Sequence, residues 1–195
     1  INVIYANMSK SREFLQFVGR GDNDYVTFNQ IYAYNKKTQK LNCINSFNSN
    51  GSYQNEIVAA DKNYVTISNT DQPAEVGWIS WNIPYKYSKG KLVASTTSTT
   101  TVKSLIANNR KDKYSKYFAK NQFVTAKKLT FYNGSKVAYT VPKGKVVTLT
   151  KLSLSKNVIY LQFKYGKKTG WAHVNGAKYD FTKHWFQGVN ARLAG

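Results

Sequence analysis

The chain has 195 residues and a formal net charge of +20, with 29 Lys and Arg against 9 Asp and Glu. This length suits one large domain or two small ones, and no apolar run approaches the roughly 20 residues that a membrane-spanning helix needs. The charge predicts an anionic partner, which could be nucleic acid, a membrane surface or an acidic cell-wall polymer. Cys43 is the single cysteine, so an intramolecular disulfide is excluded, which fits either the cytoplasm or a secreted protein.

The positive charge lies mainly in the second half of the chain. The first 100 residues contain 10 Lys and Arg against 7 Asp and Glu, a net of +3, whereas the rest contain 19 against 2, a net of +17. Between them, the polar run STTSTTTVKS (residues 95–104) has no hydrophobic period and predicts a linker. We therefore expect a first domain at 1–98, a linker at 99–118 and a basic domain at 119–195. The alternative is that threonine, which is β-branched, continues a strand through this run.

The N-terminal part repeats one order of short segments. Residues 24–46 and 63–95 each contain a Tyr-Val-Thr strand, a Tyr-x-Tyr segment, a polar turn and a Lys-Leu pair that opens another strand. The turns, residues 35–38 and 88–90, join alternating runs as hairpin turns do. Before them, residues 7–18 fit either a short helical turn or the entry to a strand. We predict a small antiparallel sheet or half-barrel built from two similar hairpins. Its expected role is presentation or adhesion, with a host surface ligand as one candidate partner.

The C-terminal part has the turn signals of a compact β structure. Asn133-Gly134 is the strongest hairpin signal in the chain, and residues 142–144 form a second turn signal before a long alternating run. A third turn, predicted at residues 166–170, precedes a strand that begins at Trp171. Five short strands within about 55 residues are typical of a small barrel, so the sequence predicts an all-β fold. We expect Trp171 to pack in this barrel or at its rim, because a small barrel needs a large side chain to close.

Two of these motifs carry a family resemblance. The lysine-glycine turn before a long strand, PKGKVVTLT, and the closing hairpin, YGKKTGWAHV, resemble the bacterial SH3-like domains appended to secreted cell-wall proteins. The tyrosine- and lysine-rich segment AKKLTFYNGSK is similar to the surface-layer-associated repeats of lactobacilli. The resemblance covers about residues 120–176. It implies a small SH3-like barrel in a secreted, cell-wall-associated protein of a Gram-positive bacterium, and it does not extend to the N-terminal part.

The basic residues of the C-terminal part are mostly lysines, with arginine only at positions 110 and 192. Arginine is expected where phosphates or base edges are bound by two parallel hydrogen bonds, whereas lysine acts as a point charge and favours loose attraction to a polyanion. Exposed aromatic side chains can add stacking on sugar faces or on bases. The predicted partner is an anionic wall polymer such as teichoic acid, peptidoglycan or polysaccharide. The predicted binding residues are Lys143, Lys145, Lys164, Tyr165, Lys167, Lys168, Tyr160 and Tyr132.

The same charge pattern leaves two other functions open. One is a nucleic-acid-binding protein that uses a basic β-barrel, and the other is a targeting module of a cell-wall hydrolase whose catalytic domain lies outside this chain. Catalysis by the chain itself has little support in its residues. The histidines are His173 and His184, and Cys43 lies in the other half, within a strand where we expect a small buried thiol.

No metal-binding, phosphate-loop or nucleophile motif is present in the sequence. We therefore predict a protein that is not an enzyme, with no catalytic residues, no metal site and no cofactor. The aromatic tail, residues 178–195, fits either a capped helical turn or a strand pair.

Overall fold

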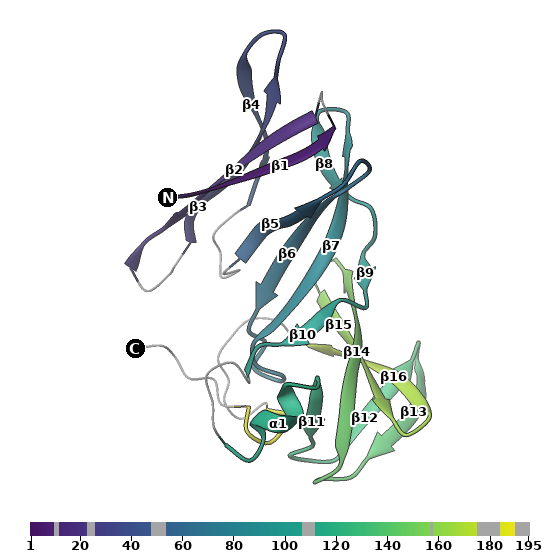
Figure 1. Cartoon of the computed structure of the whole chain (residues 1–195). Helices are drawn as coiled ribbons and strands as arrows, with labels where there is room; N and C mark the ends of the chain where they lie inside the picture. The colour runs from purple at the N-terminus through teal and green to yellow at the C-terminus, as the bar shows by residue number, and fades with distance from the viewer. Residues whose placement is uncertain are drawn as a thin grey trace. The chain divides into compact units, whose positions relative to one another are not determined.

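The structure, a computed structural model, describes residues 1–9, 12–22, 26–47, 54–106, 112–156, 158–174 and 184–189. Within these ranges the chain is nearly all β, and its one α-helix is the four-residue α1 (Ser115–Phe118). The predicted all-β class is confirmed. The chain divides into two compact units, each taken from two separate parts of the sequence (Figure 1). Unit 1 comprises Ile1–Thr70 and Asn82–Thr96, and unit 2 comprises Asp71–Trp81 and Thr97–Gly195.

Unit 1 begins with a four-stranded antiparallel meander of β1 (Asn2–Ser9), β2 (Arg12–Arg20), β3 (Val26–Asn35) and β4 (Lys40–Ser46), which pair in chain order. The described part of residues 7–18 takes the strand alternative, because it belongs to β1 and β2. The turn predicted at residues 35–38 is confirmed as the connection between β3 and β4. The Asn35 side chain fixes it by accepting hydrogen bonds from the backbone N–H groups of Lys37 and Thr38, at 3.0 and 3.2 Å.

A second, five-stranded sheet consists of β5 (Gln54–Ala60), β6 (Val65–Asp71), β7 (Ile79–Ser88), β8 (Lys91–Ala94) and β10 (Val102–Ser104). Its strand order is β10-β7-β6-β5, with β8 also paired to β7. The turn predicted at residues 88–90 joins β7 to β8. Lys89 and Gly90 have φ values of 50° and 77°, as a tight hairpin turn requires.

The two predicted copies do not fold alike. In the first copy, the Val-Thr pair and the Tyr-x-Tyr segment both lie on β3, but in the second copy they lie on β6 and β7. A turn separates them there, in which the N–H of Gly77 donates to the carbonyl of Pro73 at 2.8 Å. Proline has no N–H to donate to a ladder, so the strand cannot simply continue through this segment.

The core of unit 1 lies between the meander and the part of the five-stranded sheet that belongs to unit 1, since β10 and the first residues of β7 belong to unit 2. One buried cluster combines side chains from the meander with side chains from β5, β6 and β8; its members are Ala6, Met8, Phe14, Ile31, Ile44, Ile57, Val65, Ile67 and Leu92. Alternate residues of β2 are buried, which is the pattern of a strand with one face on a core. Two sheets that share a core therefore take the place of the predicted half-barrel.

A buried amide also joins the two sheets of unit 1. Gln16 of β2 is fully buried, and its Nε2 donates to Asn29 Oδ1 at 2.8 Å and to the carbonyl oxygen of Asn55 at 2.5 Å. Its Oε1 accepts from the backbone N–H of Ile57 at 2.7 Å. Because an unpaired buried polar group is costly, this network fixes which part of β2 lies against β5.

Unit 2 is built on a seven-stranded antiparallel sheet. Six of its strands pair in the order β11-β14-β15-β16-β12-β13, and the seventh, β9, pairs with β14. The bounds are β9 Ser98–Thr99, β11 Gln122–Val124, β12 Leu129–Asn133, β13 Lys136–Val141, β14 Val146–Ser155, β15 Val158–Tyr165 and β16 Lys168–Val174. The turns predicted at Asn133-Gly134 and at residues 142–144 are confirmed, between β12 and β13 and between β13 and β14.

The predicted closed barrel is wrong for the part of unit 2 that the structure describes. The strand path has two ends, β11 and β13, and no ladder is formed between them. Thr125, just after β11, bonds instead to the turn that follows β13. Its N–H donates to the carbonyl of Lys145 at 2.9 Å, and its own carbonyl accepts from the N–H of Gly144 at 2.8 Å. The sheet is therefore open, and turn contacts cover the gap between its ends.

The segment predicted as a linker contains regular structure. Ser98–Thr99 pairs with β14, and β10 pairs with Ile79–Trp81, the first residues of β7. The Asn121 side chain holds β10 from its other side, because its Oδ1 accepts from the N–H of Ser104 at 2.9 Å and its Nδ2 donates to the carbonyl of Val102 at 2.8 Å. Residues 98–99 and 102–104 thus take the strand alternative, as β-branched threonines favour.

The core of unit 2 is rich in phenylalanine. The ring of Phe123 lies 5.8 Å from that of Phe163 and 4.8 Å from that of Phe186, measured between centroids. Phe186 belongs to the C-terminal tail and forms an isolated antiparallel bridge with Thr125. The described part of the tail, residues 184–189, thus forms this single bridge and a turn, and contains neither of the predicted alternatives, a helical turn or a strand pair. The backbone N–H of Trp185 also donates to the carbonyl of Glu75 at 3.0 Å, which ties the tail to the 71–81 segment of unit 2.

Two further expectations concern the whole chain. No helix in the described ranges is long and apolar enough to cross a membrane. The prediction of a buried thiol at Cys43 is wrong, because Cys43 lies on β4 with its side chain exposed. Its neighbours on the strand, Leu41 and Asn42, are exposed as well, so burial on this strand does not begin until Ile44.

Candidate ligand-binding face

The solvent-facing side of the unit 2 sheet follows from the alternation along β15. Every second residue from Ile159 to Phe163 is buried, and Tyr160, Gln162 and Lys164 lie between and beyond them. Since successive side chains of a strand point to opposite faces, these three share the outer face.

Cross-strand pairing brings side chains from four strands together on this face. Tyr160 is paired with Ser153 of β14 on one side and with His173 of β16 on the other. Trp171 precedes His173 by two residues and is paired with Tyr132 of β12. Directly opposed residues of antiparallel strands have Cβ atoms about 5 Å apart. A serine, two tyrosines, a tryptophan and a histidine that are scattered in the sequence thus form one cluster.

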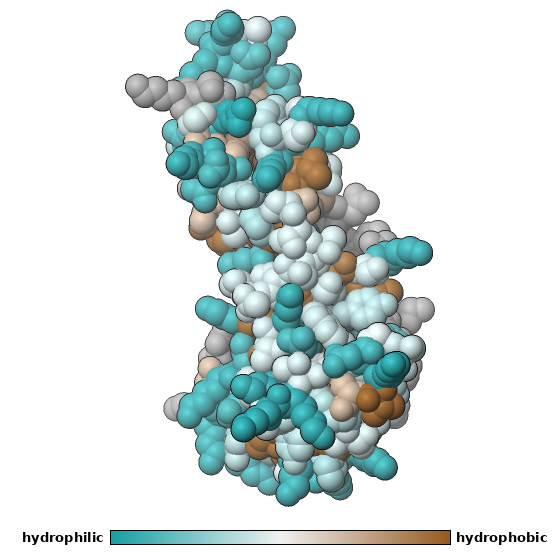
Figure 2. All heavy atoms as spheres, turned by 90° about the vertical axis from the view of Figure 1, so that its right-hand side faces the viewer, coloured by the Kyte–Doolittle hydropathy of each residue, from teal (hydrophilic) through white to brown (hydrophobic). Residues whose placement is uncertain are grey.

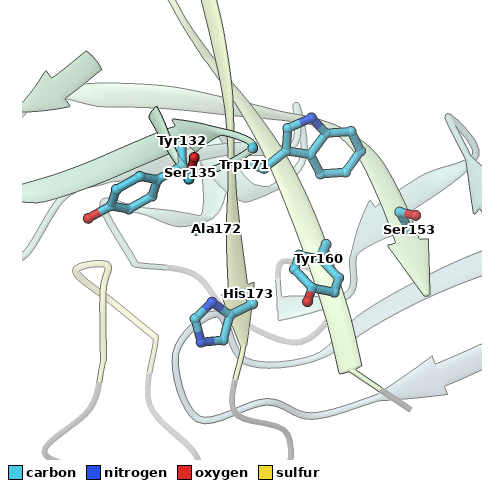
Figure 3. A pocket seen from close by; sticks show the side chains of 8 residues that line it. Tyr132, Ser135, Ser153, Tyr160, Trp171, Ala172 and His173 are labelled. Atoms are coloured by element: carbon cyan, nitrogen blue, oxygen red, sulfur yellow. The ribbon is translucent and has the colours of Figure 1, made fainter. Parts of the chain in front are cut away.

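These side chains line an open groove of about 580 Å³, which we call the aromatic groove (Figure 3). Its lining consists of Tyr132, Gly134, Ser135, Ser153, Tyr160, Trp171, Ala172 and His173. Figure 3 shows Tyr132 and Ser135 on one flank of the strand that carries His173, with Trp171 and Tyr160 on the other flank. Tyr132 and Tyr160 are 42% and 36% exposed, so their rings are accessible to a ligand. The volume lies within the range of small-molecule sites.

Gly170 accounts for the position of Trp171. A Cβ added at Gly170 would lie 2.9 Å from the Cβ of Phe131, and 3.1 Å from both the Cβ of Ala138 and the Cε1 of Tyr139. Glycine therefore allows β16 to lie closely against β12 and β13 on the inner side. With Gly170 directed inward, the next residue, Trp171, is directed outward to the groove.

The third turn differs from its prediction, and this difference sets the register of β16. The turn contains only Gly166 and Lys167, with Gly166 at φ 58°, and β16 starts at Lys168 rather than at Trp171. Gly170 is consequently a strand residue paired with Phe163, and not the end of a loop.

Tyr139 supports the groove from the inner side. Its hydroxyl donates to the carbonyl of Phe163 at 2.6 Å, and its ring is stacked with Phe131 at 4.9 Å and with Tyr165 at 6.3 Å between centroids. Only 5% of Tyr139 is exposed, and burial raises its pKa to about 12. The neutral hydroxyl thus holds β13 to β15 across the inner side of the sheet.

The lysines of unit 2 surround the groove and do not line it. Lys164 lies four residues from Tyr160 on the same face of β15, which is about 13 Å along a strand. Lys151 of β14 is paired with Gln162, and Lys136 directly follows Ser135 at the hairpin between β12 and β13. Among the described residues, the lining itself contains no lysine, arginine or carboxylate.

The structure separates the eight predicted binding residues into several places. Tyr132 and Tyr160 line the groove, and Lys164 shares its face. Tyr165 is half-buried against Tyr139, so most of its ring is not available to a ligand. The other four are exposed on turns or at a strand end; they are Lys143 and Lys145 between β13 and β14, Lys167 between β15 and β16, and Lys168 at the start of β16.

Sequence reasoning predicted two of the eight lining residues, Tyr132 and Tyr160, as binding residues. It assigned Trp171 to packing and gave no binding role to Gly134, Ser135, Ser153, Ala172 or His173. Trp171 is half-buried and borders the groove, so it packs and is accessible at once. The alternation of Trp171, Ala172 and His173 could have placed Trp171 on the outer face of the sheet. This inference requires knowing that β16 starts at Lys168.

Few negative groups oppose the lysines of unit 2. The two ion pairs found among the described residues, Arg20 with Glu56 and Lys36 with Glu13, both lie in unit 1. In the described part of unit 2, the lysines from 127 to 168 have no carboxylate within ion-pair distance, and all but Lys151 are exposed. Figure 2 shows hydrophilic side chains over much of the visible surface, with hydrophobic ones in small separate areas.

The arrangement is suited to binding. It offers aromatic rings, hydroxyl groups and an imidazole in a groove, with cations around it. No group of three or more His, Cys, Asp or Glu that could hold a metal ion occurs in the described ranges. Comparisons with protein-family models, with curated protein sequences and with solved structures found no match to this chain.

Proposed function

We propose that the chain is a non-catalytic surface protein, secreted and cell-wall-associated, whose unit 2 binds anionic wall polymers and whose unit 1 serves presentation or adhesion. The observation that carries the proposal is the net charge of +17 in residues 101–195, borne almost entirely by lysine. Exposed lysines without carboxylate partners attract a polyanion through many weak contacts. The resemblance of residues 120–176 to wall-attachment domains supports the same partner.

Lysine favours this partner over a specific nucleic-acid sequence. Residues 101–195 contain 17 lysines but only two arginines, Arg110 and Arg192. Base edges and phosphates are most often read by the two parallel hydrogen bonds of arginine. A lysine surface instead supplies sequence-independent attraction that weakens with salt.

Sedimentation of the full-length chain with purified Gram-positive walls tests the proposal. Binding should be strong at 0.1 M salt, where the Debye length is about 10 Å, and should decline at 1 M, where it is about 3 Å. Walls stripped of teichoic acid should bind less protein. Replacing Lys164, Lys167 and Lys168 together by Gln should weaken low-salt binding roughly tenfold, because each exposed contact contributes a fraction of a kcal/mol.

The matched control replaces three exposed lysines of unit 1, Lys37, Lys62 and Lys91, by Gln. It lowers the net charge by the same amount, so equal losses in both triple variants would mean that only the total charge matters. That result, or wall binding that ignores salt and lysine substitution alike, would contradict a wall-binding surface on unit 2. Tighter, salt-resistant binding to one DNA or RNA sequence would identify a nucleic-acid-binding protein instead.

A further inference from the structure

We propose that the aromatic groove is a saccharide subsite, which seats an uncharged sugar ring of the wall polymer while the surrounding lysines bind its anionic groups. This inference rests on the proposed function and adds to it the chemical class of the ligand. The polymer would carry sugar rings between or beside its charged groups, and a bare chain of phosphates would leave the groove empty.

The lining of the groove matches the two kinds of surface that a sugar ring presents. The faces of the ring carry C–H groups, which pack on aromatic side chains such as Tyr132, Tyr160 and Trp171. The rim carries hydroxyl groups, which both donate and accept hydrogen bonds. Ser135 and Ser153 provide hydroxyl groups with the same double capacity.

The absence of lysine and arginine from the described lining residues favours a sugar over a nucleotide. Single-stranded nucleic acids bind where aromatic side chains stand within a positively charged groove that follows the backbone, because every base brings a phosphate with it. Here the lining residues that the structure describes include no lysine or arginine, and Lys164 lies about 13 Å from Tyr160 along the strand. That separation suits a polymer in which an uncharged ring lies between charged groups.

The stacked ring should add a component of binding that salt does not remove. Coulombic contacts of exposed lysines are screened at 1 M salt, whereas packing of a ring on Tyr132 and Tyr160 buries apolar surface and is not screened. The full-length chain should therefore retain measurable affinity at 1 M salt for a sugar-bearing polymer. It should lose that residual affinity when the sugars are removed.

The experiment measures the affinity of the full-length chain for purified glycosylated teichoic acid at 0.1 and 1 M salt. The same polymer freed of its sugar substituents is the first comparison, and oligothymidylate is the second. Replacing Tyr132 and Tyr160 together by Ala should weaken binding at 1 M salt roughly tenfold or more. Replacing Tyr5, an exposed tyrosine of unit 1, by Ala is the matched control and should change nothing.

A second readout does not depend on the alanine variants being fully folded. Glycosylated teichoic acid should change the tryptophan fluorescence of the parent chain, and Trp171→Phe should lose most of that change because Trp171 borders the groove. Tyr160→Phe keeps the ring and should bind nearly as well as the parent. Thermal unfolding of each variant shows whether a loss of binding is a loss of structure.

The outcomes separate the subsite from the wall-binding surface. Equal affinity for the polymer with and without sugars, or equal affinity of the parent and the double tyrosine variant, would overturn the saccharide subsite. A fluorescence change with oligothymidylate but not with the glycosylated polymer would overturn it as well. If the lysine triple variant still loses low-salt binding in those cases, the proposed function stands without the subsite.

Discussion

Gly170→Ala is the substitution that most directly tests the packing behind the aromatic groove. Two of the three atoms that an added methyl group would meet, the Cβ of Phe131 at 2.9 Å and the Cβ of Ala138 at 3.1 Å, are attached to backbone. They cannot move aside without shifting β12 or β13. The third, the Cε1 of Tyr139 at 3.1 Å, belongs to a ring held by its hydroxyl bond to Phe163.

The expected cost follows from these contacts. Overpacking a core by one methyl group typically costs about 1–3 kcal/mol, and rigid neighbours place this site near the upper end. The lower conformational entropy of the unfolded alanine chain offsets about 0.4–1 kcal/mol of this. We expect a net loss of about 2 kcal/mol in the free energy of unfolding. With a urea m-value of about 2 kcal/mol/M, the unfolding midpoint should fall by about 1 M.

Urea unfolding followed by near-ultraviolet circular dichroism measures this shift. Ala138→Gly in the same chain removes one of the obstructing atoms, so the double variant should regain part of the loss, with a coupling energy of at least about 0.5 kcal/mol. The Phe131 contact remains, so the recovery should be partial. A Gly170→Ala midpoint equal to that of the parent would refute the packing argument, and strictly additive effects would exclude Ala138 as part of the cause.

Three further substitutions test other parts of the fold by the same unfolding assay. Gln16→Leu should lower the free energy of unfolding by about 2–3 kcal/mol because it leaves the buried N–H of Ile57 without an acceptor. An unchanged free energy of unfolding would show that the Gln16 network does not stabilise the fold. Tyr139→Phe should cost about 1 kcal/mol at pH 7, because the carbonyl of Phe163 loses its donor. The pKa of Tyr139 is raised from 10.0 to about 12, so its contribution is complete below pH 10 and is lost as the pH rises to 12. The parent should therefore lose stability over that window that the variant keeps, and identical pH profiles would contradict this. Burial raises the pKa of Asp71 above its ordinary 3.8, so its contribution to the stability of the fold is favourable at low pH and is lost as the pH rises. Asp71→Asn should therefore make the chain more stable at pH 7. A less stable variant would show that the charge of Asp71 is needed.

Local turn chemistry could be predicted from the sequence, and the packing of separate segments could not. Gly90 and Gly134 adopt the positive φ values that their hairpin turns need, and both turns were predicted. The turn at Gly166 was predicted too long, because two glycines, Gly166 and Gly170, both looked like turn residues. Only the contact of Gly170 with Phe131 shows that the second glycine serves close packing.

In the candidate site, too, single residues could be predicted from the sequence but their grouping could not. Exposed Tyr132 and Tyr160 were predicted as binding residues from composition and their place on short strands. Their meeting with His173 depends on the order β15-β16-β12, in which β12 pairs with a strand that lies far along the chain. No periodicity in one segment encodes such a pairing, because it is decided by which inner faces fit together.

The division of the chain has a consequence for how unit 2 can be assembled and transplanted. Its 71–81 segment is made early in synthesis, yet the carbonyl of Ala74 bonds to the ring of His184, 110 residues later. Closing so long a loop is slow compared with forming a local hairpin, so the unit should be completed only after the segment that carries His184 has left the ribosome. A fragment cut at residue 101 would lack β9 and the 71–81 segment, and would expose backbone groups such as the N–H of Leu105, which bonds to Trp78. Grafting this binding surface onto another protein would thus require residues 71–81 as well as the part from 97 onward, with a linker in place of 82–96.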